Sequence, residues 1–498
     1  MKVTEKIRNA IPEQYRDNAV IYWNKATGKF YTYLLLGVRY DPAKKRGRDI
    51  KRPLGSITLD GEFMFSKAFL KDQEIATLNA QLSGAGQERK PSKNVARKRI
   101  QTIGTVNKAV KSVKDPRQNT KVCFPLDAVL MTAVLASLGG YTDAVSIALY
   151  WRRFRDQLGF LIGNLPQEEI SHDTVNRILR LVRPGSLLVL LDKLTKPLLR
   201  QYEVRFVHID GQAVRASKNA EAINGRYFFN VYDSTSGIIL SQKLIDRKEN
   251  EITVAANVLA ALDLRPGDII TADALNTQKK LVSVLCSKDA DYCLALKDNH
   301  PKLHDEVRYL FNEEERPGLL SSVGDYDLDH GRIERRTYEI LPGRRLSEQF
   351  RQEWPGLEDG CIVRAITETE GKSGTGKKSR EERYFISSLS VGNPKLASLV
   401  GTAVRRHWQI ENNLHWELDV QYNQDRIQAT DENYLSNRTL LNKISLSILH
   451  LVGEKYRAKY GKRFSIKSLH QLCSTPAGAL DTLGMALEPS ALFENVNL

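Results

Sequence analysis

The chain has 498 residues, of which 41% are hydrophobic, and a formal net charge of +15. This length and hydrophobic content exclude a disordered chain and predict two to four domains with cores of their own. The excess of 74 Lys and Arg over 59 Asp and Glu would steer a polyanion toward the surface. Many basic proteins bind no nucleic acid, so the charge is compatible with such a partner without proving it.

The cysteines and the hydropathy pattern bear on the compartment. The five cysteines are odd in number and form no CxxC pair, which argues against a disulfide framework and a zinc ribbon. The first residues lack the apolar segment of a signal peptide, and no stretch of 18 apolar residues occurs. We therefore expect a soluble cytoplasmic protein that is found at the nucleoid when bound to DNA.

Residues 1–85 predict a small β-rich N-terminal unit, with strands at 19–23 and 30–36. A basic run at 44–52 holds six positive charges in nine positions. It could be a solvated hairpin tip or a nucleic-acid contact, and Lys45 and Arg46 are the candidates for that contact.

Residues 86–122 are predicted to be a basic linker or arm that becomes ordered on DNA. Between Glu88 and Lys121 there are eleven Lys or Arg and two acids, and Pro91, Gly104 and Pro116 interrupt any long helix. The candidate DNA contacts in this arm are Arg97, Lys98 and Arg99.

Residues 123–195 predict a helical DNA-binding module. Helices are expected at 126–138, from Thr142 to about Arg153, and from Ser171 onward, with basic residues on one side of the last helix. This pattern fits a helix-turn-helix reader, although any small helical bundle would look similar.

From residue 196 to 312 the strand and helix signals follow the order β-β-β-α-β-α-β-α, which is that of an RNase H-like core. In such a core the first and fourth strands are neighbours. This arrangement would bring Asp210 and Asp273, which end two apolar runs, close together.

Three further segments follow. Residues 313–392 predict a β-rich insertion, 393–460 the second part of the core, and 461–498 a C-terminal tail. A long helix from Asn393 would carry His407 and Glu411 on its apolar stripe. The fold class is therefore a multidomain α/β protein, with an RNase H-like catalytic core and a β-rich insertion, preceded by the small β unit and the helical module.

Asp210, Asp273 and Glu411 stand where a fold would normally avoid a carboxylate. Because an unpaired buried charge costs several kcal/mol, these positions indicate cations to be bound. Such a trio can hold two Mg²⁺ ions about 3.5–4 Å apart, with Mn²⁺ as a substitute, and catalyse phosphoryl transfer on nucleic acid.

Other polar residues compete for these roles. Asp233, Asp246, Glu417 and Asp419 are expected to be solvated surface acids. His407 and His415 bracket Glu411 at i−4 and i+4, so they could ligate zinc, but a hydrogen-bonding or DNA-backbone role is favoured because no third soft ligand is near.

Five blocks resemble the bacterial insertion-sequence transposases of the H-repeat-associated group. They are His208-Ile209-Asp210-Gly211-Gln212, Thr271-Ala272-Asp273-Ala274-Leu275, Asp291-Tyr292-Cys293-Leu294-Ala295-Leu296-Lys297-Asp298-Asn299, His330-Gly331-Arg332-Ile333-Glu334-Arg335 and His407-Trp408-Gln409-Ile410-Glu411-Asn412-Asn413-Leu414-His415-Trp416. Upstream, 115–117 and 171–174 resemble the group's N-terminal associated domain. The likeness thus spans roughly residues 115 to 450.

The resemblance implies a DDE-type DNA transposase with Asp210, Asp273 and Glu411 as catalytic and metal-binding residues. Asp210 would bridge both Mg²⁺ ions, and the enzyme would cleave the element ends and join the 3′-OH to target DNA. Its partner would be double-stranded DNA, bound by a homodimer that holds two ends. The remaining candidate DNA contacts are Lys297, Asn299, Arg332, Arg335, Arg405, Arg406 and His407.

Some positions depart from the related patterns. The group usually has Lys after Asp-Gly, where Gln212 stands here. The Tyr-Arg-Glu-Lys signature of the wider superfamily would fall on Val404, His407, Glu411 and Leu418, so its helper contacts are missing. Two alternative functions stay open: a catalytically retired, host-recruited DNA-binding protein, and an RNase H-like nuclease without strand transfer.

Overall fold

The chain divides into two compact units, Met1–Lys90 and Pro91–Leu498. Each has its own hydrophobic core. The computed structural model describes residues 3–17, 19–41, 46–66, 69, 93–163, 165–166, 168–199, 202–218, 225–245, 251–313, 321–327, 332–371 and 378–488.

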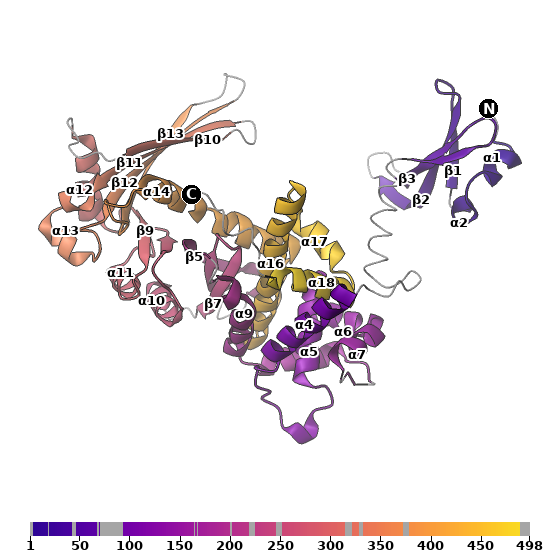
Figure 1. Ribbon diagram of the computed structural model, residues 1–498, viewed down its shortest axis with the longest axis horizontal. Coiled ribbons are helices and arrows are strands. Elements are labelled where there is room, and N and C mark those ends of the chain that lie inside the picture. The colour runs from indigo at the N-terminus through magenta and orange to yellow at the C-terminus, as the bar shows by residue number, and fades with distance from the viewer. Residues whose placement is uncertain are drawn as a thin grey trace. The chain divides into compact units, whose positions relative to one another are not determined.

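The first unit is built on an antiparallel sheet of four strands among its described residues, in the order β1-β2-β3-β4 (Figure 1). Its elements are α1 (Glu5–Asn9), α2 (Glu13–Arg16), β1 (Ala19–Asn24), β2 (Lys29–Asp41), β3 (Arg46–Ile57) and β4 (Phe63–Phe65). Phe30, Leu54 and Ile57 from the strands pack with Ile7 and Ile11 from the helical segment. Helix α1 thus covers one face of the sheet, and the strands expected at 19–23 and 30–36 are both present.

The segment expected to be a basic arm contains a long helix instead. Helix α4 (Lys93–Val110) buries Val106, Ala109 and Val110 against the main helical core. Helix α4 continues through Gly104, and no other atom of the described residues packs close to this glycine. The apolar residues at the end of α4 therefore fix the segment to the second unit.

The helices after α4 share a single core with the C-terminal part of the chain. Their bounds are α5 (Leu126–Leu138), α6 (Ala144–Arg153), α7 (Arg155–Ile162), α8 (His172–Leu181) and α9 (Pro184–Leu199). Helices α5, α8 and α9 contact the 29-residue helix α16 (Glu432–Tyr460), and α6 and α7 pack against α5. The helical module expected at 123–195 is thus continuous with the rest of the second unit.

The segment expected to be a C-terminal tail also forms helices up to residue 488. Helix α17 (Ile466–Leu472) is capped by Ser465, and α18 (Pro476–Leu487) by Thr475. Both contribute buried residues to the helical core. Helix α18 packs beside α4, so two segments about 380 residues apart in sequence stabilise each other.

The second unit also contains a mixed sheet of nine strands among the described residues, in the order β10-β11-β12-β13-β9-β8-β5-β6-β7. The strands are β5 (Arg205–Val214), β6 (Arg226–Asp233), β7 (Ile238–Ile245), β8 (Asp268–Ala272), β9 (Asp291–Leu296), β10 (Ser321–Asp327), β11 (Arg332–Pro342), β12 (Cys361–Gly371) and β13 (Ser379–Ser387). Strand β5 pairs in parallel with β8. The expected adjacency of the first and fourth strands is therefore confirmed.

Helices cover both faces of this sheet. Side chains of β5 alternate between the faces, with Val207 and Ile209 on one side and Phe206 on the other. The first side packs against α10 (Glu251–Ala261), α11 (Lys279–Cys286) and α12 (Pro301–Asn312). The second side packs against α14 (Leu396–His407).

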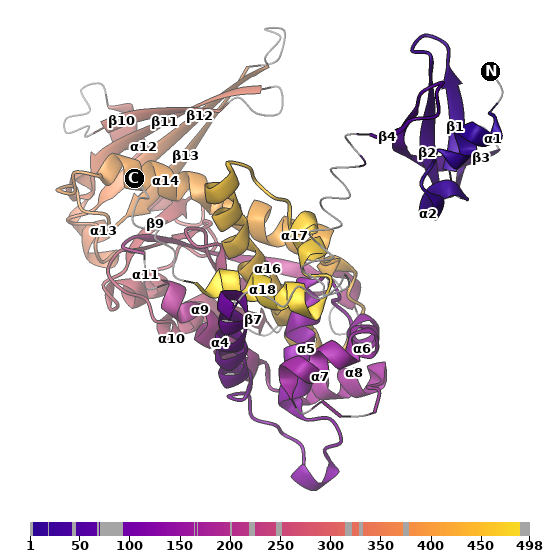
Figure 2. The ribbon, with the colours of Figure 1, turned by 45° about the vertical axis from the view of Figure 1, so that its right-hand side comes forward.

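The β-rich segment expected as an insertion continues the same sheet. Strand β13 pairs with β9 from Ser387↔Cys293 to Tyr384↔Leu296, and β10 to β12 extend outward from it (Figure 2). A short helix, α13 (Glu348–Glu353), lies between β11 and β12. The segment therefore adds four strands, β10 to β13, to the core sheet, beside β9.

Candidate active site

Asp210 and Asp273 lie side by side where the pairing of β5 with β8 ends, and their side chains are on the same face of the sheet. The register Ile209↔Ala272 makes them the next residues on the neighbouring strands. Because side chains alternate along a strand, Asp210 shares its face with Phe206, and Asp273 shares its face with Ile269. Phe206 and Ile269 both pack on the side covered by α14. The sheet thus presents both carboxylates to the helix that precedes Glu411.

Hydrogen bonds just after β8 orient Asp273. Its Oδ1 accepts from the backbone N–H of Asn276 and from the Asn276 side chain, both at 3.1 Å. The Asn299 side chain donates to the Ala274 carbonyl at 2.6 Å, which ties this turn to the loop after β9. The carboxylate of Asp273 is therefore held by a local polar frame before any ligand binds.

Glu411 lies on a π-helical turn instead of a regular α-helix. Helix α14 ends at His407, the π turn covers Ile410–His415, and α15 (Trp416–Gln421) follows. The wider turn buries Ile410 and Leu414 and leaves Glu411 exposed. The expectation of a buried stripe through Glu411 was wrong at this residue, because an extra residue per turn changes which side chains face the sheet.

Glu411 and Asp273 line one cavity of about 460 Å³. Its wall comes from the turn after β8, from β9, α12, β13 and α14, and from the residues that follow α14. Three side chains that the sequence did not single out also line it: Arg308, Arg383 and Trp408. Arg308, Arg383 and Lys297 give the cavity a cationic rim around its acids. The Arg383 guanidinium lies 6.0 Å from the centre of the Trp408 ring. Arg308 and Trp408 are exposed.

Asp210, Asp273 and Glu411 do not converge on a single point in the structure. Among the residues that the structure describes, no group of three or more His, Cys, Asp and Glu lies close enough to hold a metal ion. His407 and His415, which the sequence also offered as zinc ligands, contact Thr271 and Asp210.

His407 joins the cavity to the buried sheet. Its Nδ1 lies 2.9 Å from the Thr271 hydroxyl, which also contacts His208. Burial lowers the pKa of His407 to about 4, against the opposing effect of nearby Asp273. His407 is therefore neutral at physiological pH and anchors the end of α14 to β8.

His415 contacts Asp210 from the end of the π turn. Its Nδ1 lies 3.6 Å from Asp210 Oδ2, and its Nε2 lies 3.3 Å from the Asn230 side-chain nitrogen. Burial and the nearby Lys443 lower the pKa of His415 to about 3. The imidazole of His415 is therefore neutral, and its contact with the Asp210 carboxylate is between a dipole and a charge and is not an ion pair.

Polar residues behind Asp210 form a buried network. Gln212 donates to Asp419 at 3.1 Å and accepts from Gln424 at 3.0 Å. Burial and Asp425 raise the pKa of Asp419 to about 6. The expectation that Asp419 is an ordinary surface acid was therefore wrong. Gln212 points into this network, at the position where the related group has Lys.

Two of the other acids are also less exposed than expected. Asp233 is fully buried, accepts from Ser236 at 2.7 Å and caps the turn after β6, and burial raises its pKa. Glu417 is half-buried, and burial raises its pKa too. The expectation of solvated carboxylates was wrong for both, because tertiary packing covers them. Asp246 lies outside the described residues.

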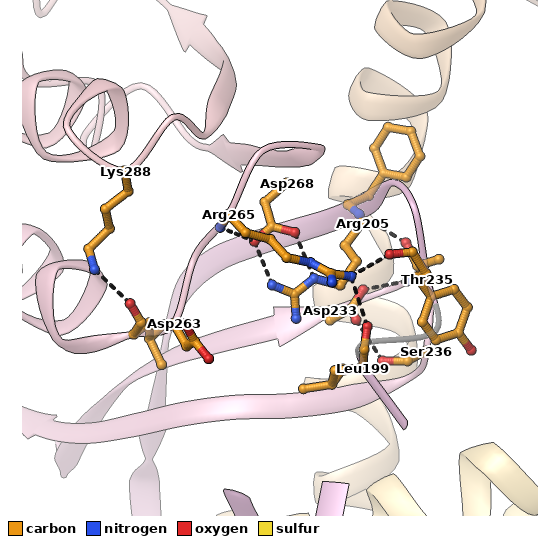
Figure 3. Close-up of polar contacts among 12 residues, drawn as sticks. Leu199, Arg205, Asp233, Thr235, Ser236, Asp263, Arg265, Asp268 and Lys288 are labelled. Carbon is orange, nitrogen blue, oxygen red and sulfur yellow. Dashed lines mark hydrogen bonds and ion pairs between the residues drawn. The ribbon is translucent and has the colours of Figure 1, made fainter. Parts of the chain in front are cut away.

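The opposite end of β5 and β8 carries a closed ion pair. Arg205 makes a two-pronged bond to Asp268, with 2.6 Å between Nε and Oδ1, and both side chains are buried. Figure 3 shows Arg205 and Arg265 gathered around Asp268, with Asp233 beside them. The backbone N–H of Arg265 adds a hydrogen bond to Asp268 at 3.0 Å. This cluster holds the strand ends together.

The candidate DNA contacts differ in exposure. Lys297, Asn299, Arg335 and Arg405 are exposed, and Arg406 is half-buried with its guanidinium 5.0 Å from the Phe206 ring. Arg99 is bound to Asp481 through two hydrogen bonds of 2.6 and 2.7 Å, so it joins α4 to α18. Lys45 lies outside the described residues, and so do the side chains of Arg46, Arg97, Lys98 and Arg332.

Within the described part of the chain, no helix combines the length and apolar character needed to cross a lipid bilayer.

Two family models match the chain. The Transposase DDE domain matches residues 202–448, and the DDE_Tnp_1-associated domain matches residues 108–193. Asp210, Asp273 and Glu411 all fall within the first match.

Curated relatives show the same likeness. The chain is 28% identical over 350 residues to the putative transposase YncI of Escherichia coli O157:H7, covering 68% of this chain and 85% of that protein. It is 28% identical over 346 residues to the H repeat-associated putative transposase YhhI of Escherichia coli strain K12, covering 68% and 88%.

A piggyBac transposase synaptic complex with hairpin DNA is similar over 80% of this chain and 83% of that one. The TM-score is 0.36 with 11% identity, so this likeness carries no weight here. The family matches and the relatives show that the chain belongs to the insertion-sequence DDE transposases of the H repeat-associated group.

Proposed function

We propose that this chain is a DNA transposase that cuts insertion-sequence ends and joins the freed 3′-OH to target DNA, using Asp210, Asp273 and Glu411. The observation that carries the proposal is the end of the β5–β8 pairing: the two carboxylates that follow it face the helix that leads to Glu411, beside a cavity with a cationic rim. The strand order β7-β6-β5-β8-β9 supports an RNase H-like core at the same place.

The donor set suits a hard divalent cation such as Mg²⁺ or Mn²⁺, which prefers carboxylate oxygens. Asp273 is already oriented by Asn276, and Glu411 is exposed on a long side chain that can turn toward it. When bound, two such ions supply an acidic centre that activates the attacking oxygen and stabilises the leaving one. We propose that Asp210, Asp273 and Glu411 would hold these ions.

The other side chains of the cavity would hold the DNA strand. Lys297, Arg308 and Arg383 are placed to offset the charge of a phosphodiester that enters it. Trp408, which is 51% exposed, offers a flat apolar surface at the cavity wall. We propose that these groups position the scissile strand beside the carboxylates.

Contacts to flanking DNA remain proposals too. Arg335 and Arg405 are exposed and could bind backbone phosphates, as could the basic run at residues 44–52 of the first unit. Because transposition requires two element ends to be held together, we also propose a homodimer on DNA.

The test uses the full chain, labelled duplexes of the element end and its flank, and Mg²⁺ or Mn²⁺. Joined products support the transposase, cut ends alone support the nuclease, and bound but uncut DNA supports the retired binding protein. Asp210→Asn should slow cleavage at least about a hundredfold with DNA binding kept. A variant that cuts at near-normal speed would exclude the assignment of Asp210.

A further inference from the structure

Lys443 is enclosed completely within the fold. It lies on α16 with 0% of its surface exposed, facing β6 and β7. Its Nζ donates to Asn230 Oδ1 at 2.7 Å and to Gln242 Oε1 at 2.6 Å, and lies 5.1 Å from the Phe228 ring. Both oxygens belong to neutral amides. Burying a lysine amine against neutral partners costs free energy, which suggests that Lys443 has a functional role.

The hydrogen-bonding capacity of each group sets a direction through this network. Burial lowers the pKa of Lys443 to about 7, and Nζ carries N–H donors in either protonation state. Nζ donates to the carbonyl oxygen of Asn230. The other end of that amide, which can only donate, then lies 3.3 Å from His415 Nε2. Nε2 must therefore accept. In a neutral imidazole the single proton is then on Nδ1.

The proton on Nδ1 faces the proposed catalytic carboxylate. Nδ1 of His415 lies 3.6 Å from Asp210 Oδ2. Asn230 is also the cross-strand partner of Asp210 in the β5–β6 register, so the amide and the carboxylate are fixed by adjacent backbone positions. The opposite tautomer would turn a nitrogen lone pair toward the carboxylate and repel it.

We propose that Lys443 is a positioning residue that, through Asn230, fixes His415 in its Nδ1–H tautomer, so that the Nδ1–H faces the Asp210 carboxylate. The peptide of His415 is held from the other side, because the Gln212 side chain donates to its carbonyl at 3.4 Å. Side chains that surround a metal-binding residue commonly orient it. The catalytic consequence rests on the proposed function, whereas the tautomer does not.

The first experiment reads the tautomer directly. Long-range ¹H–¹⁵N correlation spectra of the full chain with ¹⁵N-labelled histidine distinguish a protonated from an unprotonated ring nitrogen. The His415 signals are assigned by their loss in His415→Gln. The wild-type protein should show His415 protonated at Nδ1 and bare at Nε2. A wild-type spectrum with the proton on Nε2 overturns the proposal, whatever the variants do.

The variant Lys443→Met removes the donor that orients Asn230. We expect the His415 signals to move toward the Nε2–H form or a mixture. The matched control is Lys455→Met on the same helix, whose Nζ instead donates to the Met485 and Ala486 carbonyls. It should leave the His415 signals unchanged. A folded Lys443→Met protein with the wild-type tautomer would contradict the proposal.

Cleavage assays separate this proposal from the catalytic assignment. Lys443→Met should lower the cleavage rate at least about tenfold at saturating DNA, with DNA affinity unchanged, because only the carboxylate geometry is disturbed. Lys455→Met should cleave like the wild type. If Asp210→Asn cleaves normally while the tautomer shift is seen, the proposed function fails and the positioning role stands. If the tautomer shifts and the rate does not, the link to catalysis is refuted.

Discussion

The two ends of the strand pair β5 and β8 differ in how their charged residues are paired. At one end Arg205 and Asp268, 63 residues apart in sequence, form a buried ion pair with further hydrogen bonds (Figure 3). Five residues further along each strand, Asp210 and Asp273 bring two acids together. The contacts described above for these two acids come from His415, which is neutral, and from Asn276.

The same pair of strands therefore has one end that serves stability and another end that is suited to binding a ligand. The Arg205 end resolves its charges within the protein, so it contributes to folding and has no need of a ligand. The Asp210 end concentrates like charges at an edge beside an open cavity, which a cation can relieve. Strand pairing links the two, because the ion pair fixes the register that sets the two acids side by side.

The largest expected effect comes from breaking the structural end. Arg205→Met leaves Asp268 buried without its cation, and Asp233 is close by. We expect a loss of about 3–5 kcal/mol in the free energy of unfolding, measured by urea titration. The double variant Arg205→Met with Asp268→Leu should recover much of that loss. A loss below about 1 kcal/mol for Arg205→Met would show that the pair does not hold the strands.

The same change at the other end should have little effect on stability. Asp273→Asn keeps an oxygen that can accept from Asn276, so the free energy of unfolding should change by less than about 1 kcal/mol. Cleavage should nevertheless fall at least about a hundredfold. Urea titration and the end-cleavage assay on one preparation give both values. Equal losses of stability at the two ends would remove the contrast drawn here.

Acid should weaken the active-site half of the second unit through its buried histidines. Burial lowers the pKa values of His407, His415 and His450 to about 4, 3 and 4, below the usual 6.5. The unfolded chain then takes up protons first as the pH falls below 6.5. Each histidine should cost about 1.4 kcal/mol of stability per pH unit from there down to its folded pKa.

Urea midpoints measured from pH 7 to pH 4 check this expectation. His450 contacts the Gly237 carbonyl, and His450→Gln should reduce the slope by about 1.4 kcal/mol per pH unit. A flat profile across this range would mean that the histidines are not buried in solution.

The smallest effect is expected at a partly exposed ion pair. Arg99 and Asp481 join α4 to α18 with about a quarter of each side chain exposed. Arg99→Gln should cost about 1 kcal/mol or less, because solvent already screens the charges. Thermal unfolding compared with Arg205→Met measures how much burial adds. A larger loss at Arg99 than at Arg205 would reverse the order argued here.

The strand pairing and the position of the two Asp residues were predictable because they depend on short apolar runs. Apolar segments that end at Asp210 and Asp273 indicate buried strands, and the β-β-β-α-β order indicates which of them meet. The helices α17 and α18 were readable too: Ser465 and the pair Thr475-Pro476 are start signals, although the segment was interpreted as a tail.

The rest depends on contacts between distant segments. The π turn at Glu411 is not encoded by the apolar spacing, which fits a regular helix equally well. Lys443 finds its acceptors on strands more than 200 residues earlier in the chain. The signal that could have been read is a single Lys inside an apolar stretch of α16, which marks a buried amine without naming its partners.

Binding of Mn²⁺ to the full chain tests the central claim most directly. Calorimetric titration should show binding to the wild type and at least about tenfold weaker binding to Asp210→Asn, Asp273→Asn and Glu411→Gln. Asp298→Asn, at an exposed acid in the loop after β9, is the matched control and should bind like the wild type. If the three variants bind Mn²⁺ as tightly as the control does, these carboxylates do not share a cation site and the account is wrong.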